Sequence, residues 1–236
     1  MATIKELLVY KILREIYRWS YDYFIWPLIN LANRIKIAAI DHFWEKKLGI
    51  KTADNSQVQD DATMFKDSLM YAPTPYHVIE LILNRLQFSR DDVFIDLGCG
   101  KGRVLLTVAM KNLKKVIGIE ARKDMFDIAI ENLKRSNVKN TPVEIVNADV
   151  ATFDMREGTI FFMYNPFGVY THKCVMEHIK NSLIVNPRQV RIIYYGGGPD
   201  IHDIDGYNAW LVHKNRFFDI YNVDIWYSKF VEVPRL

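Results

Sequence analysis

The architecture of this chain can be read from ten consecutive residues, Phe94-Ile95-Asp96-Leu97-Gly98-Cys99-Gly100-Lys101-Gly102-Arg103. An apolar run ends there in Asp-x-Gly-x-Gly-x-Gly, and a helical pattern over residues 104–110 follows directly. Glycine adopts positive φ readily, and its missing Cβ lets a ligand lie against the backbone. A strand that enters a helix through such a loop is typical of an open α/β sheet with a ligand site at the strand's carboxyl end.

Short apolar runs predict the other parallel strands. They do not alternate with polar residues, as expected for strands buried on both faces. The predicted strands are Val93–Leu97, Val116–Glu120, Val143–Val146, Ile160–Asn165 and Val190–Tyr195. Helical patterns between them, most clearly Arg122–Arg135, predict a parallel sheet with right-handed crossovers.

The end of the chain differs, because no helix-length segment separates its last two strand-like runs, Arg216–Tyr221 and Asp224–Val233. These runs predict an antiparallel pair. The expected fold class is therefore α/β, with a Rossmann-like, seven-stranded, mostly parallel sheet and helices on both of its faces. An antiparallel C-terminal strand pair and a helical N-terminal extension complete it.

The N-terminal extension combines helical periodicity with positive charge. Residues 4–19 and 28–47 predict helices, and residues 51–66 are polar, so we expect an extension over 1–66 and a main domain over 67–236. Residues 1–51 carry nine Lys and Arg against five acids, and the remainder carries 22 against 23. A near-neutral main domain disfavours a nucleic-acid substrate, because phosphate binding draws on clustered basic residues.

Composition narrows the class of protein further. Half of the residues are hydrophobic, a quarter are charged and only two are cysteines. These values exclude a disordered, collagen-like or disulfide-framework chain. No charge-free run near the start approaches the roughly 20 residues of a bilayer helix, and no secretory signal is recognisable. We therefore expect a cytoplasmic protein, with peripheral membrane contact through residues 1–51 as an open alternative.

The glycine spacing bears on the cofactor. In a dinucleotide-binding fingerprint, Gly-x-Gly-x-x-Gly, the third glycine comes one residue later than Gly102 does here. Asp96 also stands just before the loop, where a pyrophosphate would meet its carboxylate. A cofactor with an ammonium group and no phosphate tolerates Asp96. S-adenosylmethionine (SAM) is such a cofactor, and an NAD-dependent oxidoreductase remains the alternative.

Polar residues follow three further strands at the same edge of the predicted sheet. Glu120 ends the second strand, where a carboxylate accepts hydrogen bonds from a ribose diol. Asp149 follows the third strand and could accept from an adenine amino group. Tyr164-Asn165-Pro166-Phe167 closes the fourth strand. This agreement between strands is more specific than any one motif.

From about Tyr71 to Val233, the sequence resembles the class I SAM-dependent methyltransferases. The resemblance implies SAM as cofactor, S-adenosylhomocysteine as product, no metal, and Asn165 beside the transferred methyl group as the candidate catalytic residue. It implies these cofactor-binding residues: Tyr71, Thr74, Asp96, Leu97, Gly98, Gly100, Gly102, Glu120, Asp149, Val150, Asn165 and Pro166.

Two segments resemble particular groups within that family. Tyr71-Ala72-Pro73-Thr74-Pro75 is similar to a segment of small bacterial and archaeal members, including protein-lysine methyltransferases, in which the Tyr and Thr approach the cofactor. Tyr-Asn-Pro-Phe-Gly at 164–168 resembles a bacterial subgroup without an assigned substrate. Methyltransferases that act on amino groups of nucleic acids and glutamine carry Pro-Pro and then an aromatic. Phe167 here follows a single proline, so their substrate class does not transfer.

The sequence thus predicts a methyltransferase with an unidentified acceptor, which is protein lysine, a small metabolite or a glycan. The alternative from a different class is a SAM-binding module that serves assembly, homo-oligomerisation or membrane attachment through its N-terminal helices. No strong general base is visible, although His172 follows the fourth motif closely enough to be a candidate.

Simpler structural roles compete at single positions. Glu120 could be a helix-start charge, Asp149 a turn residue and Asn165 a cap. Cys99 is interpreted as a small residue that fills the loop, since methyl transfer from a sulfonium needs no enzyme nucleophile. The glycines at 196–198 are either a flexible connector or a substrate entrance.

Overall fold

The computed structural model describes residues 11, 14–15, 26–53, 71–164, 168–196, 207–218 and 222–229. The chain divides into two compact units, Met1–Trp44 and Glu45–Leu236. Helix α2 (Trp26–Leu48) matches the helix expected over 28–47, whereas most of the helix expected over 4–19 lies outside the described residues. No helix in the described ranges is long and apolar enough to cross a bilayer. The boundary between residues 66 and 67 stays a prediction.

The second unit alternates strands and helices, as expected. Its elements are α3 (Tyr76–Arg85), β1 (Val93–Leu97), α4 (Arg103–Val108), β2 (Lys115–Glu120), α5 (Lys123–Arg135), β3 (Val143–Asn147), β4 (Ile160–Tyr164), α6 (Val169–Val185), β5 (Arg191–Gly196), α7 (Tyr207–Trp210), β6 (Leu211–Phe218) and β7 (Asn222–Ser228).

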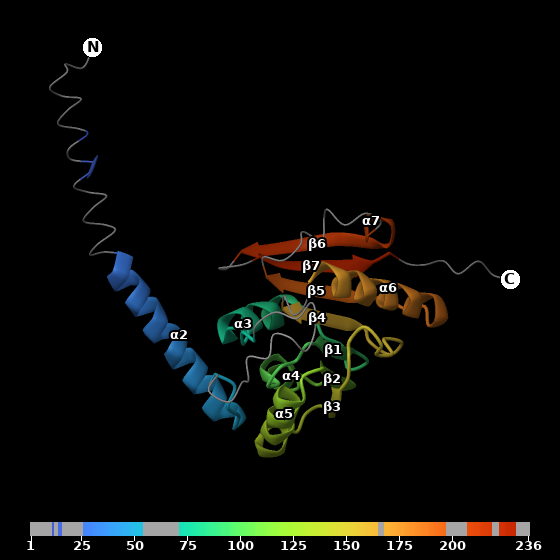
Figure 1. The fold of residues 1–236 in the computed structure, drawn as a ribbon, viewed down its shortest axis with the longest axis horizontal. Helices are drawn as coiled ribbons and strands as arrows, with labels where there is room; N and C mark the ends of the chain where they lie inside the picture. Colours follow the sequence, from blue (N-terminus) through green and yellow to red (C-terminus); the bar gives the residue numbers. More distant parts are fainter. Residues whose placement is uncertain are drawn as a thin grey trace, which may run out of the picture. The chain divides into compact units, whose positions relative to one another are not determined.

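The seven strands form one sheet in the order β3-β2-β1-β4-β5-β7-β6 (Figure 1). The first five strands are parallel, and β7 runs antiparallel to both β5 and β6. This confirms the predicted fold class. Because parallel strands share one direction, the carboxyl ends of β1, β2, β3 and β4 meet along one edge, and the glycine loop leaves β1 at that edge.

Strand β6 begins at Leu211, five residues before the predicted start at Arg216. The polar residue His213 concealed the start of this strand, whereas Arg216 lies in the run that was predicted. Both side chains bind Asp224 on β7, with His213 Nε2 at 2.7 Å and Arg216 Nε at 2.8 Å from its Oδ1. These cross-strand contacts compensate the polar groups within the sheet.

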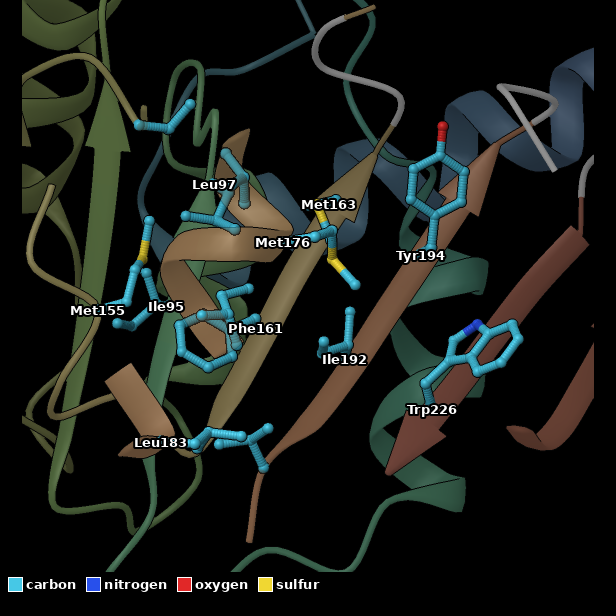
Figure 2. Close-up of a cluster of buried hydrophobic side chains, with 14 of the residues drawn as sticks. Ile95, Leu97, Met155, Phe161, Met163, Met176, Leu183, Ile192, Tyr194 and Trp226 are labelled. Atoms are coloured by element: carbon cyan, nitrogen blue, oxygen red, sulfur yellow. The ribbon is translucent and has the colours of Figure 1, made fainter. Parts of the chain in front are cut away.

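Helices cover both faces of the sheet. Successive strand residues point to opposite faces, and the face that carries Ile95 and Leu97 packs against Met176 and Ile179 of α6 (Figure 2). Helix α4 packs on β1 and β2, and α5 packs on β2 and β3. Gly118 in β2 faces α4, because a Cβ at Gly118 would lie 2.8 Å from the Leu105 side chain. The edge of the sheet from which the glycine loop leaves is therefore held between helices that pack on both faces.

The crossover from β3 to β4 departs from the expected helix between every pair of strands. Residues 148–159 are all described and form turns instead of a helix. Arg188 fastens these turns, because its Nη2 donates to Met155 O and its Nε donates to Gly158 O, both at 2.7 Å. Because the side chain of Arg188 satisfies these carbonyl groups, the chain can pass from β3 to β4 through turns without a helix.

Helix α3 begins at Tyr76. Its N-cap position is Pro75, and no side chain, that of Thr74 included, caps the helix. The Thr74 carbonyl instead accepts a hydrogen bond from Arg103 Nη1 at 3.3 Å. The segment before α3 is therefore tied to the start of α4, next to the glycine loop.

Candidate functional site

The glycine loop owes its shape to three left-handed residues. Gly98, Gly100 and Gly102 have φ of 85°, 53° and 85°, which L side chains rarely adopt. The amides of Gly98 and Cys99 both donate to Ile119 O at 3.0 Å, so the loop is fastened to the end of β2. The backbone conformation therefore favours glycine at all three positions, which are the glycines of the motif found in the sequence.

Glu120 lies directly under this loop. Its Oε2 accepts from the Gly100 amide at 2.8 Å, and its Oε1 accepts from the Arg122 amide at 2.9 Å. The side chain is 8% exposed, and burial raises the pKa of its carboxyl while the two amides oppose the rise. Each carboxylate oxygen has a second lone pair, so Glu120 can still accept from the hydroxyls of a ligand.

Asp96 is a second buried carboxyl in the same place. It is 3% exposed, and burial together with the charge of Glu120 raises its pKa to about 8, against a backbone hydrogen bond from Leu105. Two neighbouring carboxyls with raised pKa values attract a positively charged ligand, because a cation would stabilise both ionised forms. A phosphate would have the opposite effect.

Tyr71 and Thr74, which the sequence placed near the cofactor, do lie beside the loop. A Cβ on Gly100 would come within 2.6 Å of the Tyr71 ring, so the ring packs directly on this glycine. The Tyr71 hydroxyl donates to Thr52 O at 3.1 Å, and burial raises its pKa. The structure thus joins Tyr71 to Gly100 and Thr74 to Arg103, the residue that directly follows the loop.

Three residues of this site were missed by the sequence interpretation: Glu45, Thr52 and Arg103. Arg103 is 3% exposed, and its Nε donates to Thr52 Oγ1 at 2.6 Å. Its Nη2 lies 3.4 Å from Glu45 Oε1. Residues 51–66 were interpreted as a loop or boundary because they are polar, and no local pattern marks Thr52 as a buried partner.

The third strand ends at Asn147, one residue beyond the predicted end at Val146, and the acid that follows it is used in a turn. Asp149 is exposed, and its Oδ1 accepts from the Ala151 amide at 2.8 Å. Val150 is buried in the core. Asn147 Nδ2 donates to Glu120 O at 2.8 Å and so joins the ends of β3 and β2. The turn role of Asp149 is observed, and its adenine contact stays a prediction.

Asn165 and Pro166 lie outside the described residues, as do the glycines at 197 and 198. Their predicted roles stay predictions. Tyr164, the last residue of β4, has its ring centroid 4.5 Å from that of Tyr195. Because β4 runs parallel to β1, with Phe162 opposite Asp96, the fourth strand ends at the edge where the glycine loop lies.

Two other candidates are core residues. His172 is 1% exposed and packs edge-on against Tyr194, and burial lowers its pKa to about 4. A buried imidazole of that basicity is poorly suited to act as a general base near neutral pH. The Cys99 thiol is buried against Gly118, and burial raises its pKa. Cys99 fits the interpretation as a loop-filling residue.

Nothing in the described segments places three His, Cys, Asp or Glu side chains around a common metal position. The site therefore consists of a glycine loop, two buried carboxyls and an aromatic ring, with backbone amides of the loop between them.

Comparison with known proteins agrees with this description. The model of a family described as "Methyltransferase domain" matches residues 94–183. A protein-lysine N-methyltransferase of Saccharolobus islandicus is 34% identical over 95 residues, which are 40% of this chain and 58% of that protein. A histone-lysine N-methyltransferase specific for H3 lysine 79, from Dictyostelium discoideum, is 37% identical over 102 residues, 38% of this chain and 6% of that protein.

Solved structures share the fold. An RNA methyltransferase from Salinibacter ruber in complex with S-adenosyl-L-homocysteine aligns with a TM-score of 0.51 at 19% identity, over 70% of this chain and 97% of that one. A putative methylase from Haemophilus influenzae aligns with a TM-score of 0.53 at 15% identity, over 66% of this chain and 99% of that one. The chain spans less than two thirds of the two curated relatives named above.

Proposed function

We propose that this protein is a SAM-dependent methyltransferase. The observation that carries the proposal is the pair of neighbouring buried carboxyls, Asp96 and Glu120, beside a glycine loop at the carboxyl end of β1. The match of residues 94–183 to a methyltransferase domain supports it. The fold shared with the solved methyltransferases supports it as well.

The residues fit SAM in charge and in shape. SAM carries a sulfonium whose methyl group is the one transferred. Asp96 and Glu120 would stabilise its positive charges, and Glu120 would also accept hydrogen bonds from the ribose hydroxyls. Gly100 leaves the space that a Cβ would fill. Asp149 and Val150 would hold the adenine, and Tyr71, Thr74 and the Leu97–Gly102 loop would enclose the methionine part.

The reaction requires position more than acid–base chemistry. The acceptor atom must approach opposite the sulfur, about 3–3.5 Å from the methyl carbon. A bond from the acceptor to the methyl carbon forms while the carbon–sulfur bond breaks, and its electron pair stays on the sulfur of S-adenosylhomocysteine. An amine acceptor releases one proton to solvent. Asn165 would orient the acceptor from the end of β4.

For the acceptor we favour the amino group of a protein lysine. Two curated relatives act on lysine by name, and both are more than 30% identical over the matched part. The arrangement of Tyr71 against Gly100 supports the resemblance of residues 71–75 to lysine methyltransferases. The balance of 22 bases and 23 acids beyond residue 51 gives no net positive charge that would favour RNA.

Two measurements test this function. Calorimetry should detect binding of SAM and S-adenosylhomocysteine but not of NADH; the opposite preference would support the oxidoreductase alternative. Incubation with methyl-labelled SAM and a cell extract should label lysines of proteins. Label in the nuclease-sensitive fraction would replace the lysine acceptor by a nucleic acid and leave the methyltransferase proposal intact.

Asn165 has its own test. Asn165→Ala should lower turnover more than SAM affinity, because Asn165 is assigned to the acceptor side. Equal losses of both would make it a cofactor residue, and no loss in either would make it a structural cap. Asn140→Ala is the matched control, since the exposed side chain of Asn140 donates to Met110 O ahead of β2, away from the glycine loop.

The finer assignments remain proposals as well. We infer that the enzyme is cytoplasmic. We also infer that it belongs to the bacterial subgroup that residues 164–168 resemble. Homo-oligomerisation or peripheral membrane contact through residues 1–51 would be an addition to the enzymatic role. A module that only binds SAM and serves assembly would bind the cofactor without labelling any acceptor.

A further inference from the structure

A short segment, Glu45–Ala53, lies next to the glycine loop although its end is 45 positions before Gly98 in the sequence. We refer to Glu45–Ala53 as the strap. Helix α2 ends within it, because Gly49 adopts a positive φ of 75° and its amide donates to Glu45 O at 2.8 Å. A glycine of this kind is a common helix C-terminus. Leu48 and Ile50 on either side are both buried.

The turn at Gly49 brings the strap back onto Glu45. Glu45 Oε1 accepts hydrogen bonds from the Thr52 amide at 2.6 Å, from Thr52 Oγ1 at 2.7 Å and from the Ala53 amide at 2.9 Å. Thr52 is completely buried. The strap is therefore a closed, internally hydrogen-bonded turn whose one hydroxyl points into the protein.

Arg103 holds the strap from one side. This residue directly follows the glycine loop, and its guanidinium contacts Thr52 Oγ1, Thr74 O and Glu45 Oε1. The guanidinium also lies over the Tyr76 ring, 4.5 Å from the ring centroid. A planar fork with several donors suits such a position, and a lysine could not make these contacts together.

Asn132 of α5 holds the strap from the other side. Its Oδ1 accepts from the Lys51 amide at 3.0 Å, and its Nδ2 donates to Lys51 O at 3.0 Å. The same Nδ2 donates to Lys101 O, within the glycine loop, at 2.9 Å. Asn132 is 1% exposed, so a buried polar side chain on a helix joins the strap to the loop directly.

Tyr71 provides a third connection. Its ring packs on Gly100, and its hydroxyl donates to the Thr52 carbonyl. The three connections reach the strap at Glu45, Lys51 and Thr52, and they reach Gly100 and Lys101 in the loop and Arg103 directly after it.

We propose that the strap Glu45–Ala53 is a structural part of the cofactor site, and that Thr52 and Arg103 are positioning residues that hold the glycine loop in its ligand-binding shape. The inference rests on the proposed function, because it concerns the loop that would bind SAM. Rigid support of this kind lets a loop bind without first paying for its own ordering.

Two variants test the strap. Thr52→Val keeps the shape of the side chain and removes the hydroxyl between Glu45 and Arg103. Arg103→Lys keeps the charge and removes the fork. The matched control is Arg188→Lys, because Arg188 also binds several carbonyls by its guanidinium but lies before β5, at the opposite edge of the sheet.

Two readouts are needed on the full-length chain. Hydrogen exchange of the ligand-free protein reports on the amides of residues 98–106, and calorimetry reports on the dissociation constant of S-adenosylhomocysteine. We expect faster exchange in 98–106 and a dissociation constant raised about tenfold in Thr52→Val and in Arg103→Lys. Arg188→Lys should lower the melting temperature and leave both readouts unchanged.

Several outcomes would overturn the inference. Wild-type affinity in both folded variants would do so, with or without faster exchange. An equal loss of affinity in Arg188→Lys would reduce the effect to general stability. Should Arg103→Lys not fold, Thr52→Val alone decides. A wild-type chain that does not bind S-adenosylhomocysteine would instead overturn the proposed function, and the exchange data would still show whether the strap orders the loop.

Discussion

The amide of Gly100 donates to Glu120 Oε2 at 2.8 Å, so the second glycine of the loop and the last residue of β2 are joined directly. The contact explains why a buried carboxylate is tolerated there. It also means that Glu120 has two tasks, since it holds the loop and offers its remaining lone pairs to a ligand. A substitution at this position tests both.

Glu120→Ala should weaken SAM binding by about 1.5–3 kcal/mol, the range for hydrogen bonds to a charged group. That loss corresponds to roughly 10- to 150-fold in the dissociation constant. Calorimetry measures it, and circular dichroism checks that the fold is retained. Glu144→Ala, an exposed acid on the neighbouring strand β3, is the control. Unchanged affinity in a folded Glu120→Ala protein would remove Glu120 from the site.

Gly100→Ala adds a single methyl group, yet it should lower both the stability of the protein and its affinity for SAM. The residue has φ of 53°, and the new Cβ would lie 2.6 Å from the Tyr71 ring. We expect a melting temperature below that of the wild type and a loss of SAM affinity of at least about tenfold, because strained backbone alone costs of order 1–3 kcal/mol.

The double variant Gly100→Ala/Tyr71→Leu separates the two causes. The smaller side chain relieves the clash and leaves the backbone strain, so the melting temperature should recover in part. Full stability and affinity in Gly100→Ala alone would contradict the packing of Tyr71 on this glycine.

The raised pKa of Asp96, about 8, predicts a pH dependence. The folded protein holds this proton more tightly than the unfolded chain, whose carboxyl titrates near 3.8. The contribution to stability is therefore fully present below that value and is lost as the pH rises through about 8. A bound cation favours the ionised carboxyl, so SAM affinity should increase toward pH 8 and level off above it.

Calorimetry in two buffers of different ionisation enthalpy measures the proton that SAM binding releases. Asp96→Asn is the control, because its amide cannot titrate, and both pH dependences should flatten over this window. A SAM affinity that does not change between pH 6 and 8 in the wild type would mean that Asp96 does not sense the ligand.

The sequence predicted the parts of this fold that depend on local patterns. Strand β1 has the predicted bounds, Val93–Leu97, and β2 begins one residue early, because continuous apolar runs mark strands that are buried on both faces. The glycine loop was evident for the same local reason. Where polar residues are satisfied by distant partners, as His213 is by Asp224, the pattern was misleading.

The residues of the candidate site divide in the same way, into those that local patterns mark and those that distant contacts hold in place. Gly100 and Glu120 were identified because the glycine loop and the end of a strand can both be recognised from residues adjacent in the sequence. Thr52 and Arg103 were not, because their contact joins residues 51 positions apart. Asn132 was missed for another reason, because a polar residue on a helix is expected to face the solvent. Its hydrogen bonds to the backbone carbonyls of Lys51 and Lys101 explain its burial.

The N-terminal unit, Met1–Trp44, has two candidate roles that truncation can separate. Within α2, large apolar side chains such as Leu28, Ile35 and Phe43 are more than half exposed. The first 51 residues also hold the chain's excess of positive charge. Basic residues beside apolar ones suit an interface with anionic lipid. The alternative is that this apolar surface packs against protein.

Two truncations that differ by seven residues separate these roles. Removal of residues 1–44 keeps the strap and should leave SAM affinity near that of the full chain, whereas removal of residues 1–51 deletes Glu45 and Lys51 and should weaken it. If lipid is the partner, both truncated proteins stay soluble and lose salt-sensitive cosedimentation with anionic vesicles. If the segment packs against protein, the 1–44 deletion exposes apolar surface and aggregates. A full-length chain that does not bind such vesicles at low salt would exclude the lipid interface.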